Sequence, residues 1–226
     1  AVEALDTLPG GPVDEAAAGE VLAGLGVPRP RWLLLEPDAT VPASLPFDGP
    51  YVLKAVSPDL PHKSEAGAVA LGLADADAVA GALEAMQVQL AQRAPAARLR
   101  GFLVQQMGSG FGEAVIGLTR DPVCGPMISV GAGGVLAEIH ADIATRPAPV
   151  TVGTATAMVD AVRSFAPMRG YRGAPEGDLT ALAAAVAAVS TLALSPRVLE
   201  AEINPVLVGA DGVLAVDALL RLADST

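Results

Sequence analysis

The sequence predicts an α+β fold in which antiparallel hairpins and helices form layers around aliphatic cores. Short apolar runs bounded by glycine and proline alternate with longer helical patterns, and neighbouring runs are joined by tight glycine turns. Such hairpins favour α+β layers over a doubly wound parallel sheet. Of the 226 residues, 52% are hydrophobic and 3% aromatic, so the core must be aliphatic. The length suits one large domain or two small ones.

The first half of the chain begins with a stretch rich in glycine and proline, 1–13, which is typical of a linker. Asp14 is the expected N-cap of a helix that runs to about Leu25, where Gly26 ends it. Apolar runs then predict three strands, and a longer pattern that stops before Pro95 predicts a helix. These elements are the strands 31–36, 51–56 and 68–73 and the helix 77–93.

The second half contains four more predicted strands, two helices and a closing hairpin. The strands are 102–107, 113–119, 126–131 and 135–140, and the helices are 154–165 and 178–194. The runs 199–208 and 213–219 flank the turn "GADG" and therefore predict a β-hairpin.

Composition excludes several classes of function. A net charge of −11 argues against DNA or RNA as a main partner, although a small phosphate ligand remains compatible. The single cysteine, Cys124, excludes a disulfide within the chain and fits a reducing cytoplasm. No signal-peptide pattern is present, and the longest Ala/Val/Leu run, 179–194, is shorter than a membrane span. We therefore expect a cytoplasmic protein with no membrane partner. The start at Ala1 fits a piece of a longer chain.

Lys54 is the first candidate site residue. It is the only charged residue in the apolar strand "YVLKAV". An unpaired ammonium on a buried strand is costly, and an anionic ligand would relieve that cost. A lysine whose side chain reaches solvent from the strand end explains the pattern equally well.

The loop "HKSEAG" that follows carries the second candidate set. The imidazole of His62 could accept a phosphoryl group or relay a proton. Lys63 adds positive charge, and Ser64 with the amides near Gly67 could hold an oxyanion. From the residues alone, an ordinary loop histidine is the more common explanation.

The pattern "EAEINP" is more specific. Glu200, Glu202 and Asn204 are two residues apart, so on a strand they share one face. Oxygen-bearing side chains on one face suit a hard cation such as Mg²⁺, and Asp217 on the returning strand could join them. A solvated face of a half-exposed hairpin is the alternative.

The glycine loop "GAGG", residues 131–134, precedes Glu138 and Asp142. Its glycines would let the backbone approach a ligand closely, but a tight turn between strands explains them equally well. Arg146 could hold a terminal phosphate in a bidentate manner. His140 is expected to be a surface residue.

Four motifs in this order resemble the ATP-grasp domain of the NDP-forming acyl-CoA synthetases, as in the β subunit of ADP-forming acetyl-CoA synthetase. They are also similar, more distantly, to the β subunit of succinyl-CoA synthetase. The resemblance covers about residues 14–222. The motifs are "VLKAVSPDLPHKSEAGAVALGL", "LVQQMGSGFGEAVIGLTRDPVCGPM", "VGAGGVLAEIHADIATRPAPV", and "EAEINPVLV" with "AVDA".

The resemblance implies an ATP-grasp fold with two α+β subdomains and a nucleotide site between them. The larger subdomain would comprise 14–30 and 102–226, and the smaller one 31–101. The loop 57–68 would cover the phosphates of ATP or ADP. The implied catalytic residues are His62, as phosphoryl carrier, Arg146 and Glu202. The implied Mg²⁺ ligands are Asn204 and Asp217. The implied nucleotide-binding residues are Lys54, Lys63, Ser64, Gln105, Gln106, Met107, Glu113, Gly133 and Gly134.

The implied activity is phosphoryl transfer between a phosphohistidine or acyl phosphate and ADP, coupled to acyl-CoA formation. The CoA-binding half would be a partner subunit or another part of a longer chain, because no GxGxxG opens a βαβ unit here. Three departures from the family pattern are Ala68 for a second glycine, Gln106 for a carboxylate and Cys124 for a phenylalanine. A regulatory synthetase-like domain of a bacterial lysine acetyltransferase is the main alternative, and a degenerate nucleotide-binding domain is the third.

Overall fold

The computed structural model describes residues 5–60, 63, 66–134 and 141–224. The chain forms two compact units. The larger unit comprises Ala1–Arg29 and Gly108–Thr226, and the smaller unit comprises Pro30–Met107. The second boundary lies six residues after the expected one, because β5 (Gly101–Gln106) pairs with strands of the smaller unit.

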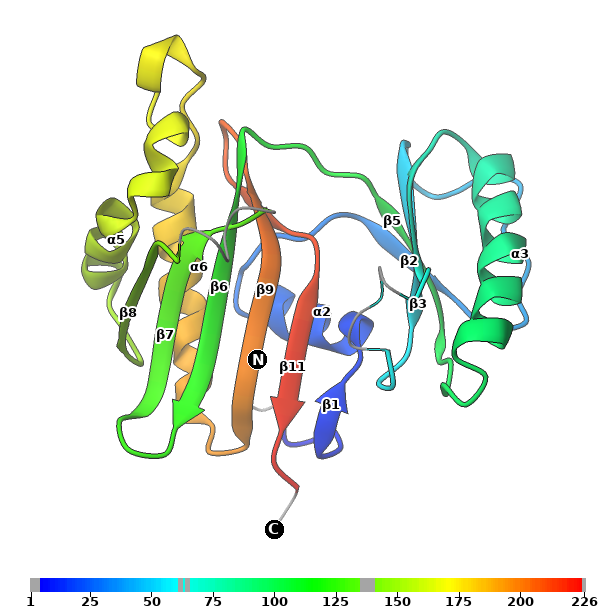
Figure 1. Ribbon diagram of the computed structural model, residues 1–226, viewed down its shortest axis with the longest axis horizontal. Helices are drawn as coiled ribbons and strands as arrows, with labels where there is room; N and C mark the ends of the chain where they lie inside the picture. The colour runs from blue at the N-terminus through cyan, green and yellow to red at the C-terminus, as the bar shows by residue number, and fades with distance from the viewer. Residues whose placement is uncertain (1–4, 61–62, 64–65, 135–140, 225–226) are drawn as a thin grey trace. The chain divides into compact units, whose positions relative to one another are not determined.

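The larger unit contains a seven-stranded antiparallel sheet in the order β1-β11-β9-β6-β7-β8, with β10 paired to β9 (Figure 1). β6 and β9 are its longest strands and lie at its centre. The strands are β1 (Gly11–Val13), β6 (Gly112–Asp121), β7 (Gly125–Ala132), β8 (Ile143–Pro147), β9 (Val198–Val208), β10 (Val213–Ala215) and β11 (Ala218–Leu222).

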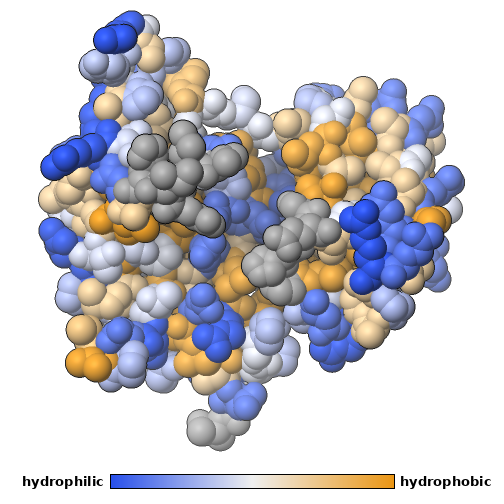
Figure 2. All heavy atoms as spheres, in the orientation of Figure 1, coloured by the Kyte–Doolittle hydropathy of each residue, from blue (hydrophilic) through white to orange (hydrophobic). Residues whose placement is uncertain are grey.

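Helices cover one face of this sheet. They are α2 (Glu15–Gly24), α5 (Val152–Ala161) and α6 (Leu179–Ser190), and Figure 1 shows α2 and α6 behind the strands. On β6, Ala114, Ile116 and Leu118 point into this aliphatic core, and the residues between them point to the other face. That other face carries the polar side chains of β9 and is turned to the viewer in Figure 2, where hydrophilic residues lie over the strands.

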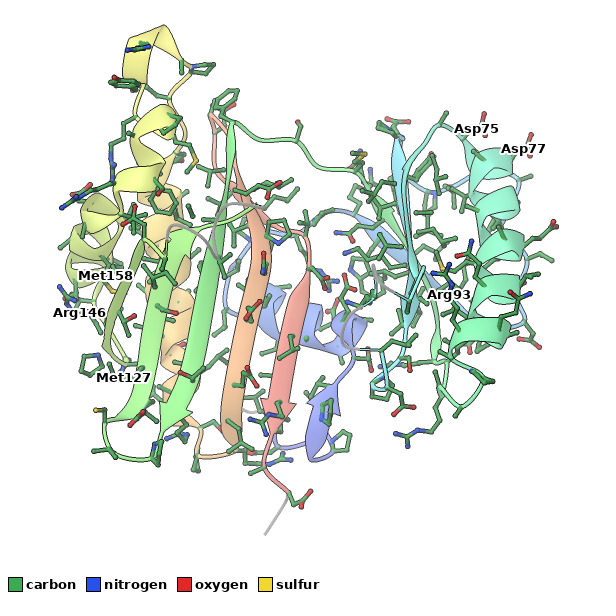
Figure 3. The ribbon with its side chains drawn as sticks, viewed as in Figure 1. Asp75, Asp77, Arg93, Met127, Arg146 and Met158 are labelled. Atoms are coloured by element: carbon green, nitrogen blue, oxygen red, sulfur yellow. The ribbon has the colours of Figure 1, made fainter. Side chains whose placement is uncertain are left out.

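The smaller unit has a four-stranded antiparallel sheet in the order β2-β5-β3-β4, covered by one helix. Its other elements are β2 (Trp32–Leu35), β3 (Tyr51–Val56), β4 (Val69–Leu73) and α3 (Ala76–Arg93). The Asp75 carboxylate accepts from the amide of Ala78 and caps α3. Asp77 in the first turn and Arg93 in the last complement the helix dipole (Figure 3).

The N-terminal stretch is not a linker, contrary to the expectation. The side chain of Leu5 is fully buried in the larger core, and β1 pairs with β11. The Arg197 guanidinium donates to the carbonyls of Leu5 and Leu8 and so holds this stretch against the rest of the larger unit. A three-residue edge strand is too short to show a periodicity, which is why the sequence did not reveal it.

Other elements differ from the expectation at their ends. The helix expected over 154–165 ends at Ala161, and a 3₁₀ helix, η1 (Arg163–Met168), follows it. A second short turn is η2 (Tyr171–Gly173), and η3 (Thr191–Leu194) continues α6. The closing strand is interrupted at Val216 and Asp217, which separate β10 from β11. The strand expected over 135–140 lies outside the described residues. No helix in the described part of the chain is long and apolar enough to cross a membrane.

Candidate functional site

The side chains of Glu200, Glu202 and Asn204 share one face of β9, as the sequence predicts. The alternate residues Ala201 and Ile203 are buried in the helix-covered core, which leaves these three on the opposite face. Within the group, the amide nitrogen of Asn204 donates to a carboxylate oxygen of Glu202 at 3.2 Å. Glu200 instead forms an ion pair with Arg221 of β11 at 3.3 Å. Glu202 and Asn204 therefore form a hydrogen-bonded pair on this face, separate from the ion pair of Glu200.

Asp217 lies opposite Asn204 across the two strands. Glu202 pairs with Leu219 in the β9–β11 register, and two residues along, the amide of Asn204 donates to the carbonyl of Asp217 at 3.2 Å. Directly paired residues share a face. The register therefore places Asp217 on the face of Glu202 and Asn204, where one of its carboxylate oxygens accepts from the amide of Ala218 at 2.9 Å.

These three side chains fit a hard divalent cation by their chemistry. Two carboxylates and one amide oxygen form the kind of donor set that Mg²⁺ takes, with further positions left for water and phosphate. The Asn204 amide nitrogen donates to Glu202, so its oxygen is the atom that faces away from that carboxylate. Among the described residues, no group of three His, Cys, Asp or Glu side chains could hold a metal alone. The amide of Asn204 is therefore necessary to complete three protein donors.

Lys54 and Gln105 lie together in the smaller unit, on the face of the sheet away from α3. In the β3–β5 register, Lys54 pairs with Leu103 and Val52 with Gln105, so all four residues share that face. None of the four belongs to the core under α3. Lys54 and Gln105 are 7% and 4% exposed. Burying an ammonium and an amide side by side on one sheet face is costly, and polar partners must offset that cost.

Gln106 and Met107, the next two implied nucleotide-binding residues, make hydrogen bonds to the loop that precedes β3. The side-chain amide of Gln106 donates to the carbonyl of Asp48 at 3.1 Å, and the backbone amide of Met107 donates to the carbonyl of Pro50 at 2.8 Å. The Met107 side chain is 41% exposed. Gln106 therefore holds a neighbouring loop, which a carboxylate could not do by donation.

The stem of the loop 57–68 is held by hydrogen bonds at both ends. His62 and Ser64 lie outside the described residues. The Arg98 side chain and amide bind both carboxylate oxygens of Asp59 at 2.8–2.9 Å. At the other end, Ala68 is fully buried and its amide donates to the carbonyl of Lys63 at 2.8 Å. Ala68 therefore fills a packed position, where the family pattern has glycine.

The glycine loop lies against Glu113. The amide of Gly133 donates to the carbonyl of Glu113 at 2.8 Å. A Cβ added at Gly133 would come within 2.9 Å of the Glu113 Cβ, so glycine is required there by close packing. Gly134 has φ +86° and also faces the Glu113 carboxylate. The structure therefore brings these three predicted residues together, while Glu138 and His140 lie outside the described residues.

Arg146, which the resemblance implies as a catalytic residue at a phosphate, lies on the other face of the larger sheet from Glu202. It lies on the edge strand β8 and pairs with Ile128, whose side chain is buried on the helix-covered face. Glu202 is in the row of Gly117, Ser129 and Thr145 on the other face. Figure 3 shows Arg146 at the outer edge of the sheet, beside α5. Thr145 and Arg146 are consecutive in β8, so Thr145 shares the face of Glu202 and Arg146 lies on the opposite, helix-covered face.

Asp142 is also engaged structurally. Its carboxylate accepts from the amide of Ser164 at 2.6 Å, at the start of η1. This hydrogen bond lowers the pKa of Asp142 below its ordinary value. Asp142 therefore caps a turn. Cys124 is exposed in the β6–β7 turn, where its amide and that of Val123 donate to Asp121 and lower the pKa of that carboxyl.

A hollow in the larger unit was not anticipated from the sequence. Its volume is about 510 Å³, and it lies between the chain that enters β6 and the β9–β10 hairpin. The two glycine-containing turns "GSGFG" and "GADG" form its rim. These turns are the features of the sequence that mark the position of the hollow. The lining residues are Pro28, Ser109, Gly110, Phe111, Leu207, Gly209, Ala210, Asp211, Gly212, Val213 and Leu214.

Known proteins resemble this chain in sequence, and solved structures resemble it in fold. The acetate–CoA ligase [ADP-forming] I of Archaeoglobus fulgidus is 41% identical over 176 residues, which cover 77% of this chain and 26% of that protein. The chain thus spans about a quarter of that relative. The β subunit of acetate–CoA ligase [ADP-forming] I of Pyrococcus furiosus is 32% identical and is matched over 92% of its length and 93% of this chain.

Among solved structures, a Ca. Korarchaeum cryptofilum acetyl-coenzyme A synthetase 1 in complex with coenzyme A, Ca-AMPCP and HgCl⁺ superposes with a TM-score of 0.88. It is 30% identical, and the match covers 94% of this chain and 93% of that chain. The sequence profile of the ATP-grasp domain family matches residues 10–222. The expected ATP-grasp fold is confirmed, and the chain belongs to the ATP-grasp domain family.

Proposed function

We propose that this chain is the nucleotide-binding and phosphoryl-transfer part of an ADP-forming acyl-CoA synthetase. The observation that carries the proposal is the donor set of Glu202, Asn204 and Asp217 on one sheet face, in a chain of this family. The named relatives are acetate–CoA ligases, and one of them is a β subunit of almost the same length. The cofactors are then Mg²⁺ and ADP or ATP, and the proposed location is the cytoplasm, where these nucleotides are abundant.

Each residue of the proposed site has a defined task. Asn204 and Asp217 would hold Mg²⁺, with Glu202 orienting the Asn204 amide through its hydrogen bond. The bound ion would neutralise phosphate charge during transfer. Lys54, buried beside Gln105, would face the nucleotide phosphates, and Lys63, Ser64, Glu113, Gly133 and Gly134 would line them. Gln105, Gln106 and Met107 would line the adenine. Arg146 is left out of this proposal because, in the β8 register, it pairs with Ile128 on the helix-covered face.

The proposed reaction moves one phosphoryl group. In the synthesis of ATP, the N–P bond of a phosphohistidine breaks and a P–O bond forms with a terminal oxygen of ADP, while the histidine recovers its electron pair. His62 would be an intermediate carrier between a phosphohistidine of the partner and ADP. Protein groups contribute mainly position and charge neutralisation to such a step. The acyl group and CoA would bind to the CoA-binding half, a partner subunit or domain.

The complete enzyme tests this proposal directly. The chain is combined with its CoA-binding half and supplied with acetate, CoA and MgATP. Acyl-CoA formation is then measured through the ADP and phosphate that are released. We expect turnover that requires both halves and Mg²⁺. Acyl-CoA formation without ATP consumption, or none in the presence of both halves, would refute it. No observation favours the regulatory acetyltransferase alternative, since the named relatives are ligases.

A further inference from the structure

The connection between α5 and α6 forms an arm, residues 163–177, that is firmly fixed to the larger unit. Figure 1 shows it in yellow, rising beyond the ends of the strands of the larger sheet. Phe165 and Met168 at its base are buried in the core. The Arg169 guanidinium donates to the carbonyls of Val159 and Val162 at 2.7 and 3.1 Å. The arm therefore holds its position without help from its outer end.

The outer end is the tip, residues 170–174, and it is closed by its own hydrogen bonds. The amide of Gly173 donates to the carbonyl of Gly170 at 3.1 Å, and the amide of Ala174 donates to that of Tyr171 at 3.2 Å. Below the tip, Arg169 and Glu176 form an antiparallel bridge. A closed turn on a fixed base loses little further freedom when it binds a partner.

Tyr171 and Arg172 are presented at this tip. The Tyr171 side chain is 60% exposed, and the Arg172 guanidinium carbon lies 5.4 Å from the centroid of its ring. Neither residue belongs to the core of the larger unit. Tyrosine and arginine are the residue types that most often dominate protein interfaces, and here they form one preformed pair. Figure 2 shows hydrophilic residues at the very end of the arm, with less polar residues beside them.

The backbone of Arg172 is strained, although the turn uses glycine at its other two left-handed positions, Gly170 and Gly173. Arg172 has φ 56° and ψ 30°, in the left-handed region. Gly170 and Gly173 have φ 75° and 80°, where glycine carries no steric cost. An arginine in this region costs free energy that a glycine would not. Among the described residues, its only side-chain interaction is with Tyr171, so the fold of this unit gains little from the side chain.

The arm is rich in basic residues, whereas the chain as a whole is acidic. The whole chain carries a net charge of −11, yet the arm has three arginines and a single acid, Glu176. A large share of the cations in the larger unit therefore lies in this short segment. The lysine and arginine residues of that unit are Arg29, Arg120, Arg146, Arg163, Arg169, Arg172, Arg197 and Arg221. Arg169 is engaged with backbone carbonyls and Arg163 lies at the base, so Arg172 is the cation that the tip presents to an acidic partner surface.

We propose that the tip docks onto the CoA-binding half of the same enzyme, with Tyr171 in an apolar depression and Arg172 paired to a carboxylate. This inference rests on the proposed function. The named relatives occur both as a long chain and as a separate β subunit, so a non-covalent contact must serve both arrangements. A protruding tip suits a protein partner, because small-molecule sites are concave.

The test uses the complex of this chain with its CoA-binding half, co-expressed as two polypeptides. Its dissociation constant is measured by sedimentation on dilution for Tyr171→Ala, Arg172→Ala, Arg172→Gly and the control Arg163→Ala. Arg163 is an exposed arginine at the base of the same arm. We expect each tip variant to raise Kd by at least ~10-fold and the control to leave it unchanged. Arg172→Gly should melt at the same or a higher temperature, because it relieves the strain.

Unchanged Kd in the tip variants, or an equal increase with Arg163→Ala, would overturn the docking proposal. Binding of MgADP to the isolated chain is measured in parallel and should be unaffected by the tip variants. A loss of MgADP affinity with unchanged Kd would assign the tip to the nucleotide and also overturn docking. If the wild-type chain fails to bind MgADP, the proposed function fails, whereas the effect on Kd still decides docking.

Discussion

Arg98 holds Asp59 by three hydrogen bonds, from its backbone amide, Nε and a terminal nitrogen, at 2.8–2.9 Å. The pair joins the segment after α3 to the start of the loop that carries His62. Because both carboxylate oxygens of Asp59 accept hydrogen bonds from Arg98, the contact fixes the orientation of the two side chains as well as the distance between them.

The Asp59 carboxyl should titrate at unusually low pH. Its hydrogen bonds with Arg98 lower its pKa from 3.8 to about 2. A depressed pKa stabilises the folded state above the unfolded pKa, and this contribution is lost as pH falls from about 4 through about 2. A carboxyl-detected NMR titration should show the low pKa, and Arg98→Ala should return it toward 3.8. The same low pKa in the variant would refute the contribution of Arg98.

Asp217→Asn should weaken magnesium-dependent nucleotide binding by roughly 10–100-fold, since it removes one anionic donor from the proposed cation site. Calorimetry with MgADP, and with ADP in EDTA, measures the effect. Asp211→Asn is the matched control, because Asp211 lies at the turn of the same hairpin, outside the donor set. Equal MgADP affinity of wild type and Asp217→Asn would remove Asp217 from the site.

His62→Ala should abolish acyl-CoA formation by the complete enzyme while MgADP still binds. In this chain, the imidazole of His62 is the group proposed to pass the phosphoryl from the partner's phosphohistidine to ADP, and its removal leaves that step without a nucleophilic nitrogen. His140→Ala is the natural control, because it removes the other histidine of the chain. Turnover is followed as acyl-CoA formed per unit time. Full turnover of the His62 variant would show that the transfer needs no relay at this position.

Arg120→Ala should destabilise the larger unit by roughly 2–3 kcal/mol, because charge-assisted hydrogen bonds are lost and buried carbonyls are left without a donor. Arg120 donates to the carbonyls of Ala193, Ser195 and Val198 at 2.9–3.0 Å and so ties η3 to the start of β9. Urea unfolding measures the change. Arg221→Ala, which breaks only the exposed pair with Glu200, should cost about 0–1 kcal/mol. A similar loss in the free energy of unfolding for both variants would contradict the proposed contribution of the Arg120 hydrogen bonds.

Most strands could be predicted because apolar residues and turns mark them. β3 was predicted at both of its ends, since proline precedes it and polar residues follow it. β1 and β8 were missed because a three-residue edge strand and a five-residue, largely exposed edge strand carry no apolar pattern. The break between β10 and β11 was missed because Val216 continues the apolar run through a site where pairing stops.

The candidate site shows a similar division. Glu202 and Asn204 could be placed on one face from their spacing alone, because the period of a strand is fixed. Arg146 could not be placed, since its face depends on which residue of β7 it pairs with, and register is a property of the folded sheet. The hollow beside the β9–β10 hairpin was likewise not predicted, because the two glycine-containing turns at its rim are distant in sequence and nothing in the sequence pairs them.

The smaller unit is inserted into the chain of the larger unit, which continues on both sides of it. Trp32 pairs with Gln105, so the first and last strands of the smaller unit begin and end next to each other. Pro28 and Ser109 line one hollow, so the two open ends of the larger unit are also neighbours. The smaller unit is thus an inserted module. Joining Arg29 to Gly108 through a few glycines would leave the sheet order of the host intact, and the excised module would keep all four of its own strands.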